Sequence, residues 1–260
     1  MIFTKQLLQY WEICAWLREG RYSVSVLLLI SFITNNAVVI DEGAFEHSAG
    51  NGATYDFIII SLGWNCQPAG FMRTHRLRFF AAPFDWCITP YSSLYKVIKN
   101  SFRNILKKEN LLPYAWNNPT VNVILDKATG IFYNHDFPEN SFNAIAKYYQ
   151  PVYDKYKRRI KRLFDQVNAG KHVYFIRYLD ITKAQACELC QLLQDQFPQT
   201  AFTLIVIGNT AADFEQDWGI PHLKNFFVYC EHGLNGNTMS EEENPFWKEL
   251  CDQIRSGVLR

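Results

Sequence analysis

The sequence has almost no excess of charge of either sign. Its 260 residues contain 26 lysines and arginines against 25 aspartates and glutamates, which leaves a net charge of +1. A chain with so little net charge has no electrostatic basis for binding nucleic acid or an anionic membrane surface. We therefore expect no nucleic-acid partner.

Motifs that bind phosphates or metals are also scarce. The sequence has no G-x-G-x-x-G motif and no P-loop. Its seven cysteines are an odd number and are scattered, unlike the pattern of a small disulfide-stabilised secreted domain. Cys187 and Cys190 form a C-x-x-C pair inside a helical pattern, with no second pair at zinc spacing. We expect reduced thiols, a cytoplasmic location, no metal and no cofactor.

An uncharged stretch near the N-terminus, residues 22–40, is about as long as a membrane span. Two asparagines interrupt it, and its dense apolar part fits a signal-peptide core or a buried element better. Membrane attachment or secretion would depend on this stretch. A polar linker follows, so we divide the chain into an N-terminal appendage, residues 1–53, and a single α/β domain with the candidate catalytic residues, residues 54–260.

The rest of the chain alternates between strand and helix patterns. Short β-branched or aromatic runs predict strands over residues 57–62, 121–125, 131–134, 173–176, 202–207 and 226–230. Apolar periodicity and capping residues predict helices over residues 68–75, 92–106, 141–168, 182–196 and 245–256.

Strand composition indicates the fold class. Nearly all-apolar strands such as residues 202–207 are typical of parallel sheets that are covered on both faces. The five-residue connection between residues 121–125 and 131–134 predicts an antiparallel hairpin. We predict a three-layer α/β fold with a mostly parallel, Rossmann-like sheet and an antiparallel hairpin. A papain-like α+β fold is the alternative.

Polar residues follow several of these strands. Ligands of an open parallel sheet bind beyond the carboxyl ends of its strands. If the strands are parallel, one rim would collect Asn65, Cys66, Arg177, Asn209 and His232. Polar residues after apolar strands are also what ordinary loops contain, so their positions alone leave both interpretations open.

Cys66 has a stronger case, because it lies just ahead of a helix with Pro68 in its first turn. Free backbone N–H groups and the positive end of the helix dipole stabilise a thiolate there, and the thiolate is the nucleophilic form. The same N–H groups, with Asn65 or Arg177, could hold an oxyanion. We count Asn65 and Arg177 among the candidate substrate-binding residues.

A cysteine nucleophile needs a base within hydrogen-bond reach, normally a histidine. Of six histidines, His135 and His232 stand at the ends of predicted strands. A single histidine at a strand end is more often a hydrogen-bonded structural residue, so position alone leaves its role open.

Four ordered motifs, ISLGWNC, PFDWCITP, FYNHDFP and VYFIR, resemble the bacterial DUF1796 family, which is described as papain-like cysteine peptidases. The resemblance covers about residues 60–208. It implies Cys66 as the nucleophile and His135 as the base, with a carboxylate that orients the imidazole.

The orienting carboxylate could be Asp85 or Asp136. If residues 134–136 are extended, Asp136 points away from His135 and Asp85 is the better candidate. A bend at the following Phe-Pro pair would favour Asp136 again. Asp85 could instead cap backbone amides in a tight structural turn.

The predicted function is that of a thiol-dependent hydrolase, a cysteine peptidase or an acyltransferase. Its substrate would be a peptide, an amide or another small carbonyl compound, and Arg177 could bind an anionic group on it. Two alternatives use the rim of Arg177, Asn209 and His232: a glycosyl- or nucleotidyltransferase-like enzyme, or a non-catalytic ligand-binding domain. No oligomeric state is predicted.

Overall fold

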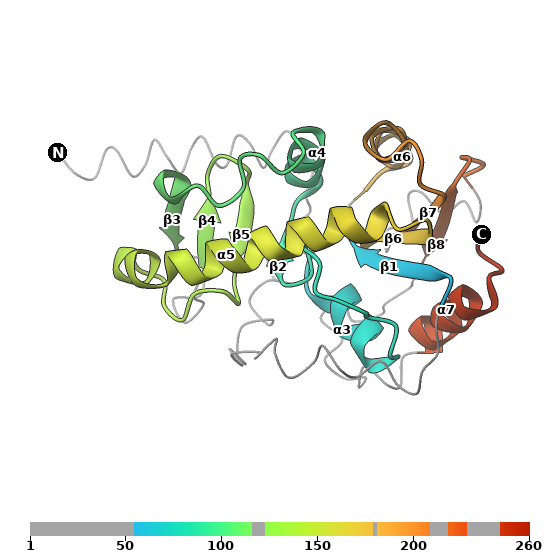
Figure 1. Cartoon of the computed structure of the whole chain (residues 1–260), viewed down its shortest axis with the longest axis horizontal. Helices are drawn as coiled ribbons and strands as arrows, with labels where there is room; N and C mark the ends of the chain where they lie inside the picture. The colour runs from blue at the N-terminus through green and yellow to red at the C-terminus, as the bar shows by residue number, and fades with distance from the viewer. Residues whose placement is uncertain (1–54, 116–122, 179–180, 209–217, 228–244) are drawn as a thin grey trace.

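The computed structural model describes residues 55–115, 123–178, 181–208, 218–227 and 245–260 (Figure 1). The N-terminal appendage, with its uncharged stretch, lies outside these residues. None of the helices within the described ranges is both long and apolar enough to cross a membrane.

Four of the described strands form a parallel sheet in the order β1-β6-β7-β8, which confirms the predicted sheet. They are β1 (Phe57–Ser61), β6 (His172–Tyr178), β7 (Phe202–Gly208) and β8 (Leu223–Phe227). Because all four run the same way, the residues that follow them share one end of the sheet.

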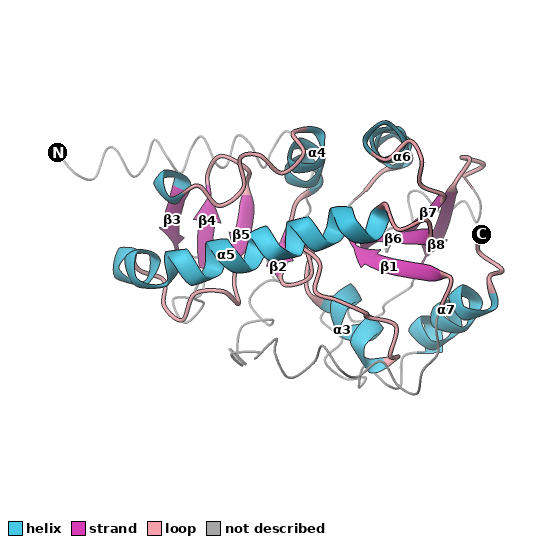
Figure 2. Ribbon diagram, viewed as in Figure 1, coloured by secondary structure: helices cyan, strands magenta, loops and turns pink. Residues whose placement is uncertain are grey.

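Helices cover both faces of the parallel sheet, as predicted (Figures 1 and 2). They are α3 (Gln67–Thr74), α4 (Tyr91–Lys99), α5 (Phe142–Val167), α6 (Lys183–Gln196) and α7 (Pro245–Ser256). Side chains of β1 alternate between the two faces. Ile58 and Ile60 join the core formed with α4, α5 and α6, whereas Phe57 and Ile59 join the core formed with α3 and α7.

The predicted hairpin belongs to a second, separate sheet. This antiparallel sheet has the order β2-β5-β4-β3. Its strands are β2 (Cys87–Ile88), β3 (Leu111–Tyr114), β4 (Val123–Asp126) and β5 (Ile131–Tyr133), and a short 3-10 helix, η3 (Lys108–Asn110), precedes β3. Strands β4 and β5 are the predicted pair.

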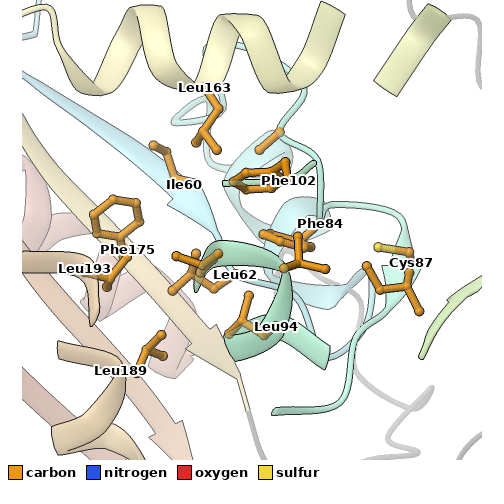
Figure 3. Packing of buried hydrophobic residues seen from close by; sticks show 14 of the residues in the cluster. Ile60, Leu62, Phe84, Cys87, Leu94, Phe102, Leu163, Phe175, Leu189 and Leu193 are labelled. Atoms are coloured by element: carbon orange, nitrogen blue, oxygen red, sulfur yellow. The ribbon is translucent and has the colours of Figure 1, made fainter. Parts of the chain in front are cut away.

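The two sheets share a continuous core. Helix α5 runs past both of them (Figure 1). Ile131 and Tyr133 of β5 belong to the same buried cluster as Ile60 of β1 and Leu163 of α5. Figure 3 shows Ile60 and Phe175 of the parallel sheet packed near Leu163 of α5 and Leu193 of α6.

Two element boundaries differ from the predictions by three residues or more. The helix expected over residues 92–106 ends at Lys99, and Ser101 and Phe102, with φ of 49° and 60°, turn the chain away. Strand β8 begins at Leu223, three residues ahead of the predicted strand 226–230, whose remaining residues lie outside the described part. Apolar residues continue past Lys99, which lengthened the predicted helix. In β8 the polar Lys224 and Asn225 follow Leu223, which delayed the predicted start of the strand.

Candidate active site

A strained turn joins β1 to α3. Gly63 and Trp64 both have φ of 77°, in the left-handed region that a bulky residue such as tryptophan rarely adopts. Gly63 N donates to Ser61 Oγ at 3.1 Å, and Thr89 N donates to Trp64 O at 3.1 Å. The turn is therefore held by β1 itself and by the segment that follows β2.

Cys66 is the N-cap residue of α3, at the carboxyl end of β1. Its carbonyl accepts from Gly70 N at 2.9 Å, and its thiol makes no capping bond. Pro68 stands in the first turn, as predicted. Asn65 is buried, with Oδ1 accepting from Gln67 N at 3.0 Å and Nδ2 donating to Gln67 Oε1 at 3.2 Å. Asn65 thus shapes the start of the helix that Cys66 caps.

The other described thiols differ from Cys66 in their surroundings. Burial raises the pKa of Cys190 to about 11 and that of Cys251 to about 12, and it raises the pKa of Cys87 still further. Cys66 is half-buried and Cys187 is exposed. A thiol with a raised pKa carries little thiolate at neutral pH, so Cys87, Cys190 and Cys251 are poor nucleophiles. Cys66 and Cys187 are the accessible thiols of the described residues.

His135 follows β5 in a bend of the chain. Its ring meets the ring of Trp86 edge-on, with centroids 6.1 Å apart and an interplanar angle of 83°. Its Nε2 is buried and has no hydrogen-bond partner among the described residues. Burial lowers the pKa of His135, while the nearby charge of Asp136 opposes that effect. A neutral imidazole is the form that a general base needs.

Two side chains of α5 hold the carboxylate of Asp136. Its Oδ2 accepts from Tyr156 Oη at 2.8 Å, and its Oδ1 pairs with Lys155 Nζ at 2.6 Å. Residues 134–136 form bends, so the extended geometry that would have disfavoured Asp136 is not present. The partners on α5 escaped the sequence analysis, because a lysine and a tyrosine in a basic helical run are typical of a solvated face.

Asp85 holds a turn before β2. Its Oδ2 accepts from Ala82 N at 2.9 Å and from Arg78 Nε at 3.0 Å. Burial raises the pKa of Asp85, and the Arg78 guanidinium opposes this. Its Oδ1 is buried, and no hydrogen-bond partner for it lies in the described part of the chain. Within the described residues, no hydrogen bond joins His135 to Asp85 or to Asp136.

Trp86 connects the helix that begins at Cys66 with His135. The tryptophan belongs to the buried cluster against which Cys66 packs, and its ring also contacts His135. Arg73 of α3 lies over the Trp86 ring at 5.7 Å, and Arg78 lies over it at 5.4 Å. The pairing of β2 with β5 brings this tryptophan to the end of β5. Sequence analysis missed its role, although it stands inside the PFDWCITP motif.

Arg177 lies within β6 rather than after it, and its side chain is fully buried. Its Nη1 donates to Leu62 O at 3.0 Å and to Thr89 O at 2.9 Å. Arg177 therefore braces the turn after β1 against the segment that follows β2. The other two predicted rim residues, Asn209 and His232, lie outside the described residues.

These features define an α/β protein with a thiol at a strained strand-to-helix turn and a half-buried histidine at the end of a neighbouring sheet. Residues 57–206 match the family described as "Putative papain-like cysteine peptidase (DUF1796)". The match covers more than half of the chain, so the protein belongs to this family, and it includes Cys66, Asp85, His135 and Asp136. No curated protein and no solved structure matches the chain.

Proposed function

We propose that the protein is a thiol-dependent hydrolase or acyltransferase in which Cys66 is the nucleophile and His135 is the general base. The observation that carries the proposal is the strained Gly63–Trp64 turn, which ends β1 and puts Cys66 at the N-cap of α3. Strain of this kind persists where the surrounding structure enforces it, and it is concentrated at functional sites.

The reaction begins when the Cys66 thiol gives its proton to the neutral imidazole of His135. The thiolate attacks the substrate carbonyl carbon, and the electron pair of the C=O bond moves to oxygen. Backbone N–H groups at the start of α3 stabilise the oxyanion. When the carbonyl re-forms, the C–N or C–O bond breaks, and the leaving group takes the proton from His135.

The second half-reaction releases the acyl group from the thioester. Water, or an acceptor amine or alcohol, attacks the thioester carbonyl while His135 removes its proton. The C–S bond breaks, and the Cys66 sulfur takes back the proton. Water as the acceptor makes the protein a hydrolase, and another nucleophile makes it an acyltransferase.

Asp136 is the carboxylate that we propose as the electrostatic partner of His135. Its charge favours the protonated imidazole that forms during the reaction, and Lys155 and Tyr156 keep it in place. Asp85 instead supports Arg78 and the turn before β2. Two substitutions separate these roles. Asp136→Asn should slow acylation, whereas Asp85→Asn should chiefly lower the free energy of unfolding.

The proposal is tested by assaying a mixed set of peptides, amides and thioesters with the wild type, Cys66→Ala and Cys187→Ala. Turnover should disappear in Cys66→Ala, a loss of at least about 1,000-fold, since the nucleophile is gone. The exposed thiol of Cys187 provides the matched control, and its replacement should leave turnover unchanged. Turnover that survives in Cys66→Ala would refute the proposal.

A further inference from the structure

A cavity of about 670 Å³ lies at the opposite end of the parallel sheet from Cys66. It is lined by the first residue of β6, His172, by Phe202 at the start of β7, and by the segment that enters β8. Leu259 and Arg260 close it from another side. A cavity of this size holds a small organic ligand.

Basic side chains from separate segments meet in this cavity. His172, His222, Lys224 and Arg260 all line it, and among the described lining residues there is no aspartate or glutamate. The nearby acid is Asp56, which pairs with Arg260 through one guanidinium nitrogen. Burial and the charge of Arg260 lower the pKa of His172, a protonated His222 acts in the same direction, and Asp56 opposes them, so the basic groups lie close enough to repel one another. A bound anion would relieve that repulsion.

Hydrogen bonds fix the histidine on the cavity wall. Thr203 Oγ1 donates its single hydrogen to the carbonyl of Leu259 at 3.0 Å. It must therefore accept from His172 Nε2, which lies 3.0 Å away. The His172 ring is held with Nε2 protonated, and any further proton goes to Nδ1. This arrangement ties β6, β7 and the Leu259 segment into one rigid wall.

The remaining lining is apolar. Ile220, Pro221 and Leu259 line the cavity beside the basic residues. A purely inorganic anion would leave this surface without contact, whereas a ring or short chain attached to the anion would cover it.

We propose that this cavity binds a small organic phosphate, with the phosphate at Lys224, Arg260 and the two histidines and the apolar body against Ile220 and Pro221. A dianion matches the two cations, Lys224 and Arg260, which come from different segments, better than a single carboxylate does. Strand β1 has five residues, so the cavity and Cys66 are separated by roughly 17 Å along the sheet. The site is therefore distinct from the proposed active site and does not depend on its chemistry.

Calorimetric titration of the full chain tests the proposal with phenyl phosphate, inorganic phosphate, phenol and benzoate. Phenyl phosphate should bind more tightly than the other three. Lys224→Gln should weaken phenyl phosphate and inorganic phosphate by about tenfold each, as expected when one charge-assisted contact is lost. Ile220→Ser should weaken phenyl phosphate alone.

Two controls make the result specific. Lys127→Gln changes an exposed lysine in the turn between β4 and β5 and should leave binding unchanged. Cys66→Ala should also bind phenyl phosphate normally, which separates this proposal from the proposed function. Benzoate binding more tightly than phenyl phosphate, an undiminished affinity in Lys224→Gln, or no measurable binding would each overturn the proposal.

Discussion

Tyr156 of α5 donates a 2.8 Å hydrogen bond to the buried carboxylate of Asp136, the residue next to His135. The long helix thus supports the end of β5 at the point where the candidate base stands. Tyr156 is itself buried, with the Tyr133 ring edge-on to it at a centroid distance of 5.2 Å.

Replacing Tyr156 with phenylalanine should remove this hydrogen bond without leaving a large void. We expect the free energy of unfolding to fall by about 2 kcal/mol, because a buried carboxylate loses a donor. Urea unfolding measures the change. Tyr153→Phe, at a half-buried position on the same helix, is the matched control and should cost less than about 0.5 kcal/mol. Equal costs for the two variants would contradict the role given to Tyr156.

Stability should depend on pH through His135. Burial lowers its folded-state pKa below the ordinary value of 6.5, so the unfolded chain binds the proton more tightly. The contribution of the neutral histidine to stability is complete above pH 6.5 and is lost as the pH falls below that value. His172, whose pKa is also lowered, acts in the same direction.

Urea unfolding of the wild type and His135→Gln between pH 5.5 and 8 measures this dependence. The wild type should lose more stability than the variant as the pH falls below 6.5. The free energy of unfolding of the variant should still fall with pH to the extent that His172 contributes. Parallel curves for the two proteins would show that His135 is not buried as a neutral group.

The turn that precedes Cys66 should tolerate no side chain at Gly63. A Cβ there would lie 3.2 Å from Thr89 Cβ and 3.3 Å from Phe84 Cβ. Gly170 has the same φ of 77° but nothing within 4 Å of the added carbon, so Gly170→Ala isolates the backbone cost, about 1 kcal/mol. We expect Gly63→Ala to lower the free energy of unfolding by at least about 1 kcal/mol more. Thermal unfolding of both variants checks this difference.

Arg177 should behave as a structural residue. Lysine keeps the charge but lacks the planar fork, so Arg177→Lys should lose at least one of the bonds to the carbonyls of Leu62 and Thr89 and cost about 2–4 kcal/mol. Arg158→Lys, on the exposed face of α5, should be neutral in the same urea titration. A variant of Arg177 with unchanged stability and a raised KM would instead support the predicted contact with substrate.

Much of the parallel sheet was predictable from the sequence. Strands β1, β6 and β7 are apolar on both faces, and each is followed by residues that break the strand, so composition alone located them. The sheet that contains the hairpin was harder to foresee. Strand β2 has only two residues, and β3 contains Pro113, which is tolerated because β3 is an edge strand.

The candidate site also combines features that the sequence predicted with features that it did not. Cys66 could be singled out because a strand, a turn and a proline follow one another within a few residues. The support of Asp136 by Lys155 and Tyr156 could not, since it joins segments about twenty residues apart through tertiary packing. The burial of Arg177 was also missed, because β6 continues past the arginine that was expected to end it.

The central claim, that Cys66 is activated by its position and by His135, is tested most directly by the rate at which iodoacetamide alkylates each cysteine. Peptide mapping over time gives the rates of Cys66 and of the exposed Cys187 in one sample at pH 7. We expect Cys66 to react at least about tenfold faster than Cys187, despite being less exposed, and His135→Ala to remove this advantage. Equal rates in the wild type, or a Cys66 rate that His135→Ala leaves unchanged, would contradict the account.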